Sequence, residues 1–347
     1  AAWDWWHYSE KIRQLKYDFS EEEIKPYFSE DNVLKGAFDV ANKLFGISFN
    51  ERKDLPVYRD NVRTFEVLDQ NDEVMGIFFT DYTVRPNKGG GAWMNSFISQ
   101  SNFDGKQIPI IANTCNFPPP DKNGISLLSF EQVETLFHEF GHALHGLLSD
   151  VEYPSLAGTR VSRDFVELPS QLMENWGRHP EVIKTYAKHY KTGETIPDEL
   201  LEKISKASTF NQGFATTEYV AASYLDMAWH TIKDPVNDAN KFEDSVLDGI
   251  GLIPQIETRY RSTYFGHIFA GGYATGYYSY LWTEVLEADA FEPFKDNGLF
   301  DKDTADKLRK YIYSSGNSDD LMTQYVRYRG SEPEIGPLLE KRGLDNF

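Results

Sequence analysis

The sequence has one cysteine, no long apolar run and few basic residues for its size. With only Cys115 among 347 residues, an internal disulfide is impossible, which fits a reducing compartment such as the cytoplasm. No uncharged apolar run is long enough for a transmembrane helix, so we expect no membrane partner. Lys and Arg number 35 against 54 Asp and Glu, a net charge of −19. This acidic balance argues against nucleic-acid binding, which needs a basic patch.

The amino terminus of the given sequence shows no recognisable targeting signal. The first residues are charged and amphipathic, do not resemble a signal peptide, and start without methionine. We therefore expect a cytoplasmic monomer that is either a natural short form or an excised piece of a longer protein. A leader removed from a longer precursor would leave no trace here.

Hydrophobic periodicity divides the chain into three segments. Residues 1–60 are predicted to be helical, with "NVLKGAFDVANKLFG" ending at Gly46 and a capping box at Ser20 and Glu23. Residues 61–115 contain four strand-like stretches, and residues 125–347 return to helical spacing. The sequence therefore predicts one domain over 1–347, mainly α with a small, mostly antiparallel β-sheet.

The stretch "HEFGH" (138–142) carries the first chemical signal. Ser129 and Gln132 fit a capping box, so a helix is predicted to begin there. His138 and His142 are four residues apart and share one face, with Glu139 beside it. H-E-x-x-H on a helix can hold zinc through two imidazoles while the glutamate acts on a water. The alternative is a pair of core histidines bonded to carbonyls, which would suit a lone histidine better than the whole motif.

His145 lies on the same predicted face, seven residues after His138. Seven residues rise roughly 10 Å along a helix, whereas zinc–nitrogen bonds are only about 2 Å long. One ion cannot easily reach both ends of that row. We expect His145 to be structural or to support a ligand.

The segment "GTRVSRDFVELPSQLMENW" (158–176) contains candidates for a third zinc ligand. Ser162 or Asp164 can cap a helix there, and Pro169 would kink it. Glu167 and Glu174 share a face, and by spacing alone either completes a two-histidine, one-glutamate site. A solvated acidic face is the other interpretation, but the neighbouring apolar residues indicate a buried helix, where a glutamate needs a partner. Those neighbours are Phe165, Val166, Leu168 and Leu172.

These segments resemble the thimet oligopeptidase and peptidyl-dipeptidase family of zinc peptidases. The likeness covers most of the chain, in family order: "WDWWHYSEKIR", "GGGAWMNSF", "NTCNFPPP", "LLSFEQVETLFHEFGH", "FGHIFAGGYATGYYSYLWTEV" and "YRGSEPEIGPLLEKRGL". The resemblance implies a zincin-type catalytic domain with one Zn²⁺ per chain. Because the family's metal-binding glutamate is that of the D-F-V-E string, it selects Glu167 over Glu174, beside His138 and His142.

A tyrosine-rich segment follows His267. Tyr273, Tyr277 and Tyr280 are spaced i, i+4 and i+7, which predicts one face of a helix and by itself favours an aromatic core stripe around glycines. The resemblance implies instead that His267, Tyr273 and Tyr280 face the zinc and the scissile peptide. The six-residue step from His267 to Tyr273 resembles the peptidyl-dipeptidase branch.

The activity implied is zinc-dependent hydrolysis of short peptides, with release of C-terminal dipeptides. Glu139 is expected to be the general base, and a tyrosine with His267 to stabilise the oxyanion. Asp164 or Glu174 would orient an imidazole, and the strand around "GGGAWMNSF" would pair with extended substrate. Four arginines are candidates for reading the substrate's carboxylate: Arg259, Arg261, Arg327 and Arg329.

Three other functions stay open. One is an endo-acting oligopeptidase of the same family, and another is a helical protein with chance histidines. Family members are about twice this length, and the N-terminal half that forms the other wall of their channel has no counterpart here. The third is therefore a zinc-binding fragment that is inactive without that half, which also becomes a candidate partner.

Overall fold

The computed structural model describes residues 4–18 and 20–345. Its sheet has five strands: β1 (Ser48–Glu51), β2 (Arg63–Leu68), β3 (Val74–Thr83), β4 (Trp93–Ile98) and β5 (Ile110–Phe117). They lie in the order β1-β2-β3-β5-β4, with β3 and β5 parallel and the other three pairings antiparallel. The predicted small, mostly antiparallel sheet is confirmed. β4 lies at one edge, and most of its residues are exposed.

The helical segment at the start is shorter than predicted. Its helices are α1 (Trp5–Tyr17), α2 (Glu21–Ile24) and α3 (Glu30–Phe45). Gly46 ends α3 in the left-handed conformation, at φ 69°, which glycine adopts without steric cost. β1 then follows inside the predicted helical range, because pairing with β2 and not side-chain periodicity selects this short strand. Ser20 precedes α2, but its side chain makes no capping hydrogen bond.

The rest of the chain is helical, as predicted. Its helices are α4 (Phe130–Leu147), α5 (Arg163–Val166), α6 (Leu168–Arg178), α7 (Pro180–Tyr186), α8 (Asp198–Ala207), α9 (Gln212–Thr231), α10 (Ala239–Gly249), α11 (Gly266–Phe269), α12 (Ser279–Asn297), α13 (Lys302–Leu308), α14 (Leu321–Arg329) and α15 (Gly336–Arg342). A π-helical turn, Arg309–Tyr313, follows α13. None of the described helices is long and apolar enough to cross a membrane.

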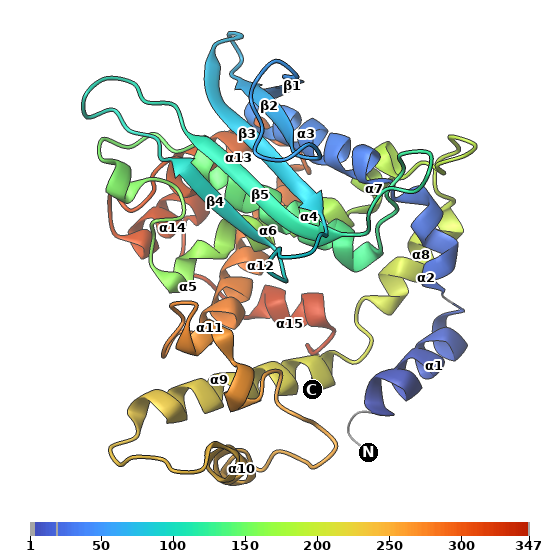
Figure 1. Cartoon of the computed structure of the whole chain (residues 1–347), viewed down its shortest axis with the longest axis vertical. Helices are drawn as coiled ribbons and strands as arrows, with labels where there is room; N and C mark the ends of the chain where they lie inside the picture. Colours follow the sequence, from blue (N-terminus) through green and yellow to red (C-terminus); the bar gives the residue numbers. More distant parts are fainter. Residues whose placement is uncertain (1–3, 19, 346–347) are drawn as a thin grey trace.

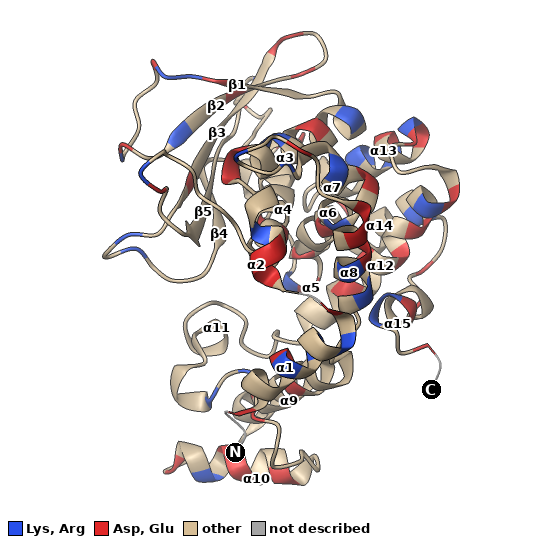
Figure 2. Ribbon diagram, turned by 90° about the vertical axis from the view of Figure 1, so that its right-hand side faces the viewer, with Lys and Arg blue, Asp and Glu red and all other residues tan. Residues whose placement is uncertain are grey.

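Helix α4 is the centre of the fold. Figure 2 shows the sheet on one side of α4 and α6 and α12 on the other. Its apolar residues Phe137 and Phe140 are fully buried in the main core, together with Phe78 from the sheet and Trp176 from α6. Burial of such aromatic rings contributes a large share of the free energy of folding. The helix that carries the histidines is therefore held from two sides.

A smaller part of the chain lies beside this core. Helices α9, α10 and α11 lie below the sheet and its helices in Figure 1. This part has its own small cluster of buried residues, namely Ala222, Phe265, Ile268 and Tyr277. The cluster joins α9 to the segment that holds the predicted catalytic tyrosines.

Candidate metal centre

Local sequence fixes where α4 begins and which face it buries. The Ser129 hydroxyl accepts a hydrogen bond from the backbone N–H of Gln132 at 3.1 Å, and the Gln132 side chain accepts one from the N–H of Ser129 at 2.9 Å. Two amides that the helix cannot satisfy are thus paired. The predicted capping box is present, and it fixes the residue at which α4 begins.

Gly141, inside the H-E-x-x-H motif, lets α4 and α6 approach closely. A Cβ atom at this position would lie 2.5 Å from the carbonyl oxygen of Pro169 and 2.6 Å from Cα of Ser170. No side chain fits in that space. The glycine between the two histidines therefore brings α4 against the start of α6, where the third candidate ligand lies.

Glu167 lies at a break in the helix predicted around Pro169. α5 ends at Val166 and α6 begins at Leu168, with Pro169 in its first turn. Proline suits the first turn of a helix, because its missing N–H would have no partner there. The expected kink is thus a change of helix, with Glu167 at the junction. The Ser170 hydroxyl donates to Oε2 of Glu167 at 3.1 Å.

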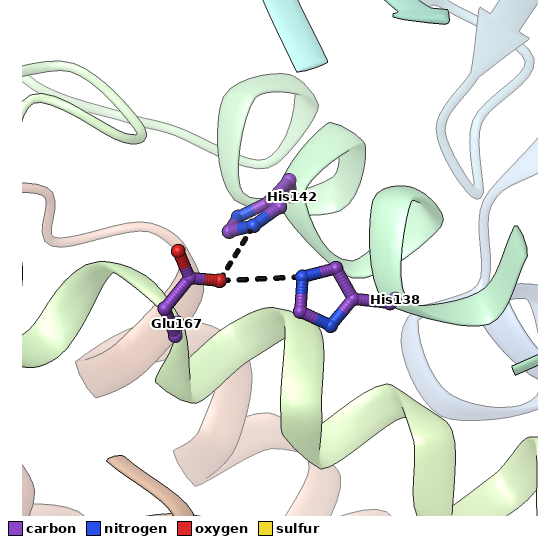
Figure 3. A group of neighbouring side chains, drawn as sticks. All are labelled: His138, His142 and Glu167. Carbon is purple, nitrogen blue, oxygen red and sulfur yellow. Dashed lines mark hydrogen bonds and ion pairs between the residues drawn. The ribbon is translucent and has the colours of Figure 1, made fainter. Parts of the chain in front are cut away.

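His138, His142 and Glu167 converge on one point (Figure 3). Oε2 of Glu167 lies 3.2 Å from Nε2 of His138 and 3.0 Å from Nε2 of His142. The three donor atoms lie within 4.8 Å of one another. Tetrahedral zinc with bonds of about 2.0–2.2 Å separates its donors by about 3.3 Å. The donor types and their spacing therefore fit one zinc ion.

The electrostatics of the group favour a cation. Burial acts to lower the pKa of His138, but hydrogen bonds to Glu167 and Glu174 raise it well above its ordinary value. Burial acts in the opposite direction on Glu167, yet the two imidazoles hold its pKa well below the usual range. The carboxylate therefore stays ionised, as a metal ligand must be.

Glu139 is buried beside these ligands. Its Oε2 has no hydrogen-bond partner among the described residues, and burial raises its pKa. A buried carboxylate oxygen without a partner costs free energy and calls for an explanation. A water molecule held at the metal centre would supply the partner.

The neighbours of the ligands separate two candidates that the sequence left open. Nδ1 of His138 lies 2.8 Å from Oε1 of Glu174, whereas Asp164 accepts a hydrogen bond from the Ser162 hydroxyl. Because a carboxylate can only accept, Nδ1 donates its hydrogen to Glu174, which leaves Nε2 as the nitrogen that would release its proton to bind a metal on the Glu167 side. Glu174 is thus placed to orient His138, and Asp164 is not.

His145 lies apart from the metal group. It is fully buried, and both ring nitrogens lack partners among the described residues. Burial lowers its pKa to about 3, so it is neutral. Its ring packs edge-on against Tyr313, with centroids 6.3 Å apart. It packs as a structural residue, as the helical rise predicts.

The helix predicted through Tyr273, Tyr277 and Tyr280 is wrong for the first two. α11 ends at Phe269 and α12 begins at Ser279, so neither Tyr273 nor Tyr277 lies in a helix. The physical reason is glycine, which weakens helices: the segment holds Gly271, Gly272 and Gly276.

The tyrosines nevertheless reach the metal group. The Tyr273 hydroxyl donates to Oε1 of Glu167 at 2.8 Å, and the ring of Tyr273 stacks on that of Tyr280 with centroids 5.2 Å apart. The His267 ring lies 6.1 Å from Tyr273 and 6.3 Å from Tyr280. Burial and the Glu167 charge raise the pKa of Tyr273 to about 12, so its hydroxyl keeps its proton at neutral pH.

The four candidate arginines have different surroundings. All four pair with carboxylates: Arg259 with Glu218, at the longest distance of 3.8 Å, Arg261 with Glu243, Arg327 with Asp319 and Arg329 with Asp289. Arg259 lies near the aromatic group, since its charge, after burial, helps to lower the pKa of His267. Of the four, Arg259 is the one next to the tyrosines.

Sequence reasoning missed Arg163, whose guanidinium lies over the ring of Tyr273 at 4.8 Å. The available signal was its position four residues before Glu167.

Comparisons with known proteins place the chain. The model of peptidase family M3 matches residues 1–344. Dipeptidyl carboxypeptidase from Salmonella typhimurium is 45% identical over 99% of this chain and 51% of that protein. Oligopeptidase A from Escherichia coli is 40% identical over 99% of the chain and 51% of that protein. The chain thus spans about half the length of these relatives.

A solved structure supports the fold. The M32 carboxypeptidase from Deinococcus radiodurans matches with a TM-score of 0.52 and 17% identity over 92% of this chain and 60% of that chain. Together with the family model, which covers nearly all of the sequence, this confirms the family resemblance and the fold class. The chain belongs to peptidase family M3, a family of metallopeptidases.

Proposed function

We propose that the chain carries the zinc site of a peptidase that releases dipeptides from the C-termini of short peptides. The observation that carries the proposal is the convergence of His138, His142 and Glu167 beside the buried Glu139, whose Oε2 has no partner among the described residues. Zinc bound by the three ligands would polarise the scissile carbonyl and lower the pKa of water toward 7.

The residues of the chain would divide the remaining work. Glu139 would accept a proton from water and pass it to the leaving amine, for which its raised pKa suits it. Tyr280 would donate a hydrogen bond to the negative oxygen that develops on the substrate, and so would Tyr273 once its hydroxyl hydrogen turns away from Glu167, with His267 beside both. Glu174 would keep the Nε2 atom of His138 turned to the site.

The edge of the sheet supplies a place for extended substrate. β4 is an edge strand with exposed residues, so its free backbone groups can pair with a peptide. A cavity of about 250 Å³ lies beside it, lined in part by Asn95, Ser96, Gly146 and Arg160. Gly146 is four residues beyond His142, about one helical turn. A peptide along β4 would place a side chain in this cavity.

The dipeptidase mode rests on similarity to the dipeptidyl carboxypeptidase of Salmonella. Similarity to oligopeptidase A favours the alternative, an endo-acting oligopeptidase. Free and C-terminally amidated peptides distinguish the two, since only a dipeptidase needs the free carboxylate. A cytoplasmic location and a monomeric state stay predictions from the sequence.

A partner is proposed as well, namely the N-terminal half of the relatives. The chain spans about half their length, and α1 exposes large apolar side chains: Trp6, Tyr8, Ile12 and Leu15. Exposed apolar patches of this kind mark interaction surfaces. A separately expressed N-terminal half of a relative, added in trans, would then bind and raise activity.

One experiment tests these proposals together. The purified chain is loaded with zinc, its metal content is measured, and paired free and amidated peptides are added for mass spectrometry. We expect one zinc per chain and stepwise loss of dipeptides from free C-termini only. Internal cuts that ignore amidation would indicate an oligopeptidase. Bound zinc without cleavage, relieved by the N-terminal half, would indicate an incomplete site, and no bound zinc would contradict the proposal.

A matched variant separates chemistry from metal binding. Glu139→Gln keeps the shape of the side chain but removes the base, so we expect full zinc content and turnover lowered by at least about 10²-fold. A variant that binds zinc and keeps full activity would contradict the role of Glu139.

A further inference from the structure

The turn that carries Tyr273 has an unfavourable backbone conformation. Thr275 has φ 56°, in the left-handed region that β-branched residues rarely adopt. Gly272 is also left-handed, at φ 78°. A turn that is unfavourable by itself persists only when its surroundings hold it. What holds it decides where the hydroxyl of Tyr273 lies.

Helix α9 supplies the hold through Asp226, which is fully buried. Its Oδ1 accepts a hydrogen bond from the backbone N–H of Thr275 at 3.0 Å, and its Oδ2 accepts one from the N–H of Tyr277 at 2.9 Å. Nδ1 of His230, one turn along α9, lies 2.8 Å from Oδ1. Two amides on either side of Gly276 are thus fixed to one carboxylate.

A second contact joins the same two segments. The hydroxyl of Tyr219, on α9, donates to the carbonyl oxygen of Tyr277, and the two rings stack with centroids 5.0 Å apart. The turn is therefore tied to α9 through its amides and through a carbonyl. Asp226 lies in none of the segments on which the family resemblance rests, and it follows an apolar stretch of α9.

The chemistry of the contact requires a carboxylate. Two backbone N–H groups need two acceptor atoms, and ionised aspartate offers both of its oxygens. An asparagine offers one oxygen and one NH₂ group, and the NH₂ group would face an amide N–H as a second donor. Loss of one of two such buried hydrogen bonds should release the turn.

We propose that Asp226 is a positioning residue that holds the turn Tyr273–Tyr277 on α9 and thereby keeps the Tyr273 hydroxyl at Glu167 and its ring against Tyr280. Its effect on turnover rests on the proposed function. The hold itself does not, and it can be measured without substrate.

The first test is hydrogen–deuterium exchange on the full chain, with and without zinc. In Asp226→Asn, the amides of Thr275 and Tyr277 should exchange at least tenfold faster, while peptides from α4 exchange as before and the zinc content is unchanged. Asp289→Asn is the matched control, because Asp289 is equally buried and accepts from Tyr325 on α14. That control should leave the turn protected. Unchanged exchange at Thr275 and Tyr277 in Asp226→Asn would overturn the proposal.

The second test asks whether Asp226 acts through the tyrosine. On zinc-loaded protein that cleaves peptides, Asp226→Asn should lower kcat about tenfold or more, and adding it to Tyr273→Phe should cause little further loss. Additive losses would reject positioning and leave a general effect on stability. If the chain binds zinc but cleaves nothing, the proposed function fails. The exchange experiment would still show whether Asp226 holds the turn on α9.

A milder variant keeps the proposal testable if Asp226→Asn fails to fold. Tyr219→Phe removes the other contact and leaves the carboxylate in place. If α9 holds the turn, exchange at Tyr277 should rise severalfold in this variant. Wild-type exchange in Tyr219→Phe, combined with an unfolded Asp226→Asn, would count against the proposal, because the carboxylate would then serve only the stability of the chain.

Discussion

Nδ1 of His138, on α4, lies 2.8 Å from Oε1 of Glu174, on α6. Glu174 in turn receives a hydrogen bond from Arg178 at 2.9 Å. Both partners favour an ionised carboxylate, and although burial acts to raise its pKa, the charges of Arg178 and His138 lower it. A fixed carboxylate behind an imidazole raises the basicity of the nitrogen that faces the metal.

Replacing Glu174 should therefore weaken metal binding without removing a ligand. In Glu174→Gln we expect zinc affinity to fall about tenfold or more, the range found when such outer partners are lost. Competition with a chromogenic chelator measures it. Asp164→Asn is the control, since Asp164 bonds to Ser162 and not to either imidazole, and its zinc affinity should match that of the unaltered chain. Equal losses in both variants would contradict the assignment.

The hydroxyl of Tyr280 is predicted to act on the reaction and not on the metal. Burial and the nearby charge of Glu167 raise its pKa, so it remains a hydrogen-bond donor at neutral pH. In Tyr280→Phe we expect kcat to fall by about 10²–10³-fold, the usual cost of one oxyanion donor, with unchanged zinc content and little change in KM. Steady-state kinetics on a free-carboxylate peptide measures this.

A neighbouring tyrosine provides the control for this prediction. Tyr278 lies two residues away and is 45% exposed, so Tyr278→Phe should leave kcat unchanged. A loss confined to KM in Tyr280→Phe would assign Tyr280 to substrate binding and contradict its role on the oxyanion.

Sequence was sufficient for the parts of the site that local rules control. The capping box at Ser129 fixes the start of α4. Residues four apart in an α-helix share a face, which places His138 and His142 side by side. Glu167 needed the family resemblance, because spacing left it equal to Glu174. The structure gives both glutamates a role: one faces the two Nε2 atoms, and the other bonds to Nδ1 of His138.

The parts that sequence could not give depend on contacts between distant segments. The spacing of Tyr273 and Tyr280 suggested one helix, but glycines favour turns, and α9 holds the turn through Asp226. A carboxylate on one helix that bonds to amides some 49 residues later leaves no periodic signal. β1 escaped for a similar reason, since its pairing with β2 defines it.

The close approach of α4 and α6 makes a further prediction at Gly141. Glycine to alanine inside a helix normally stabilises by roughly 0.5–1 kcal/mol. Here the new Cβ would lie 2.5 Å from a backbone oxygen that cannot yield. We expect Gly141→Ala to lower the free energy of unfolding by about 1–3 kcal/mol and to weaken zinc binding, as measured by urea unfolding and chelator competition. Gly213→Ala, where no atom lies within 4 Å of the new Cβ, should not destabilise.

The last prediction concerns pH and a carboxyl group outside the set of metal ligands. Burial, followed by the charge of Asp31, raises the pKa of Glu30 from 4.5 to about 7. A raised carboxyl pKa means that the folded chain holds the proton more tightly than the unfolded chain, so the stability this group contributes is full below about pH 4.5 and is lost as the pH rises through about 7. Glu30→Gln removes the ionisation. Its free energy of unfolding should match that of the unaltered chain near pH 4.5 and exceed it by up to about 3 kcal/mol at pH 8.

Glu51→Gln is the opposite control: a hydrogen bond from Arg63 lowers the pKa of Glu51, so this variant should be less stable at pH 8. Urea unfolding at both pH values measures the differences, and a Glu30→Gln variant no more stable at pH 8 than the unaltered chain would show that Glu30 ionises there without cost.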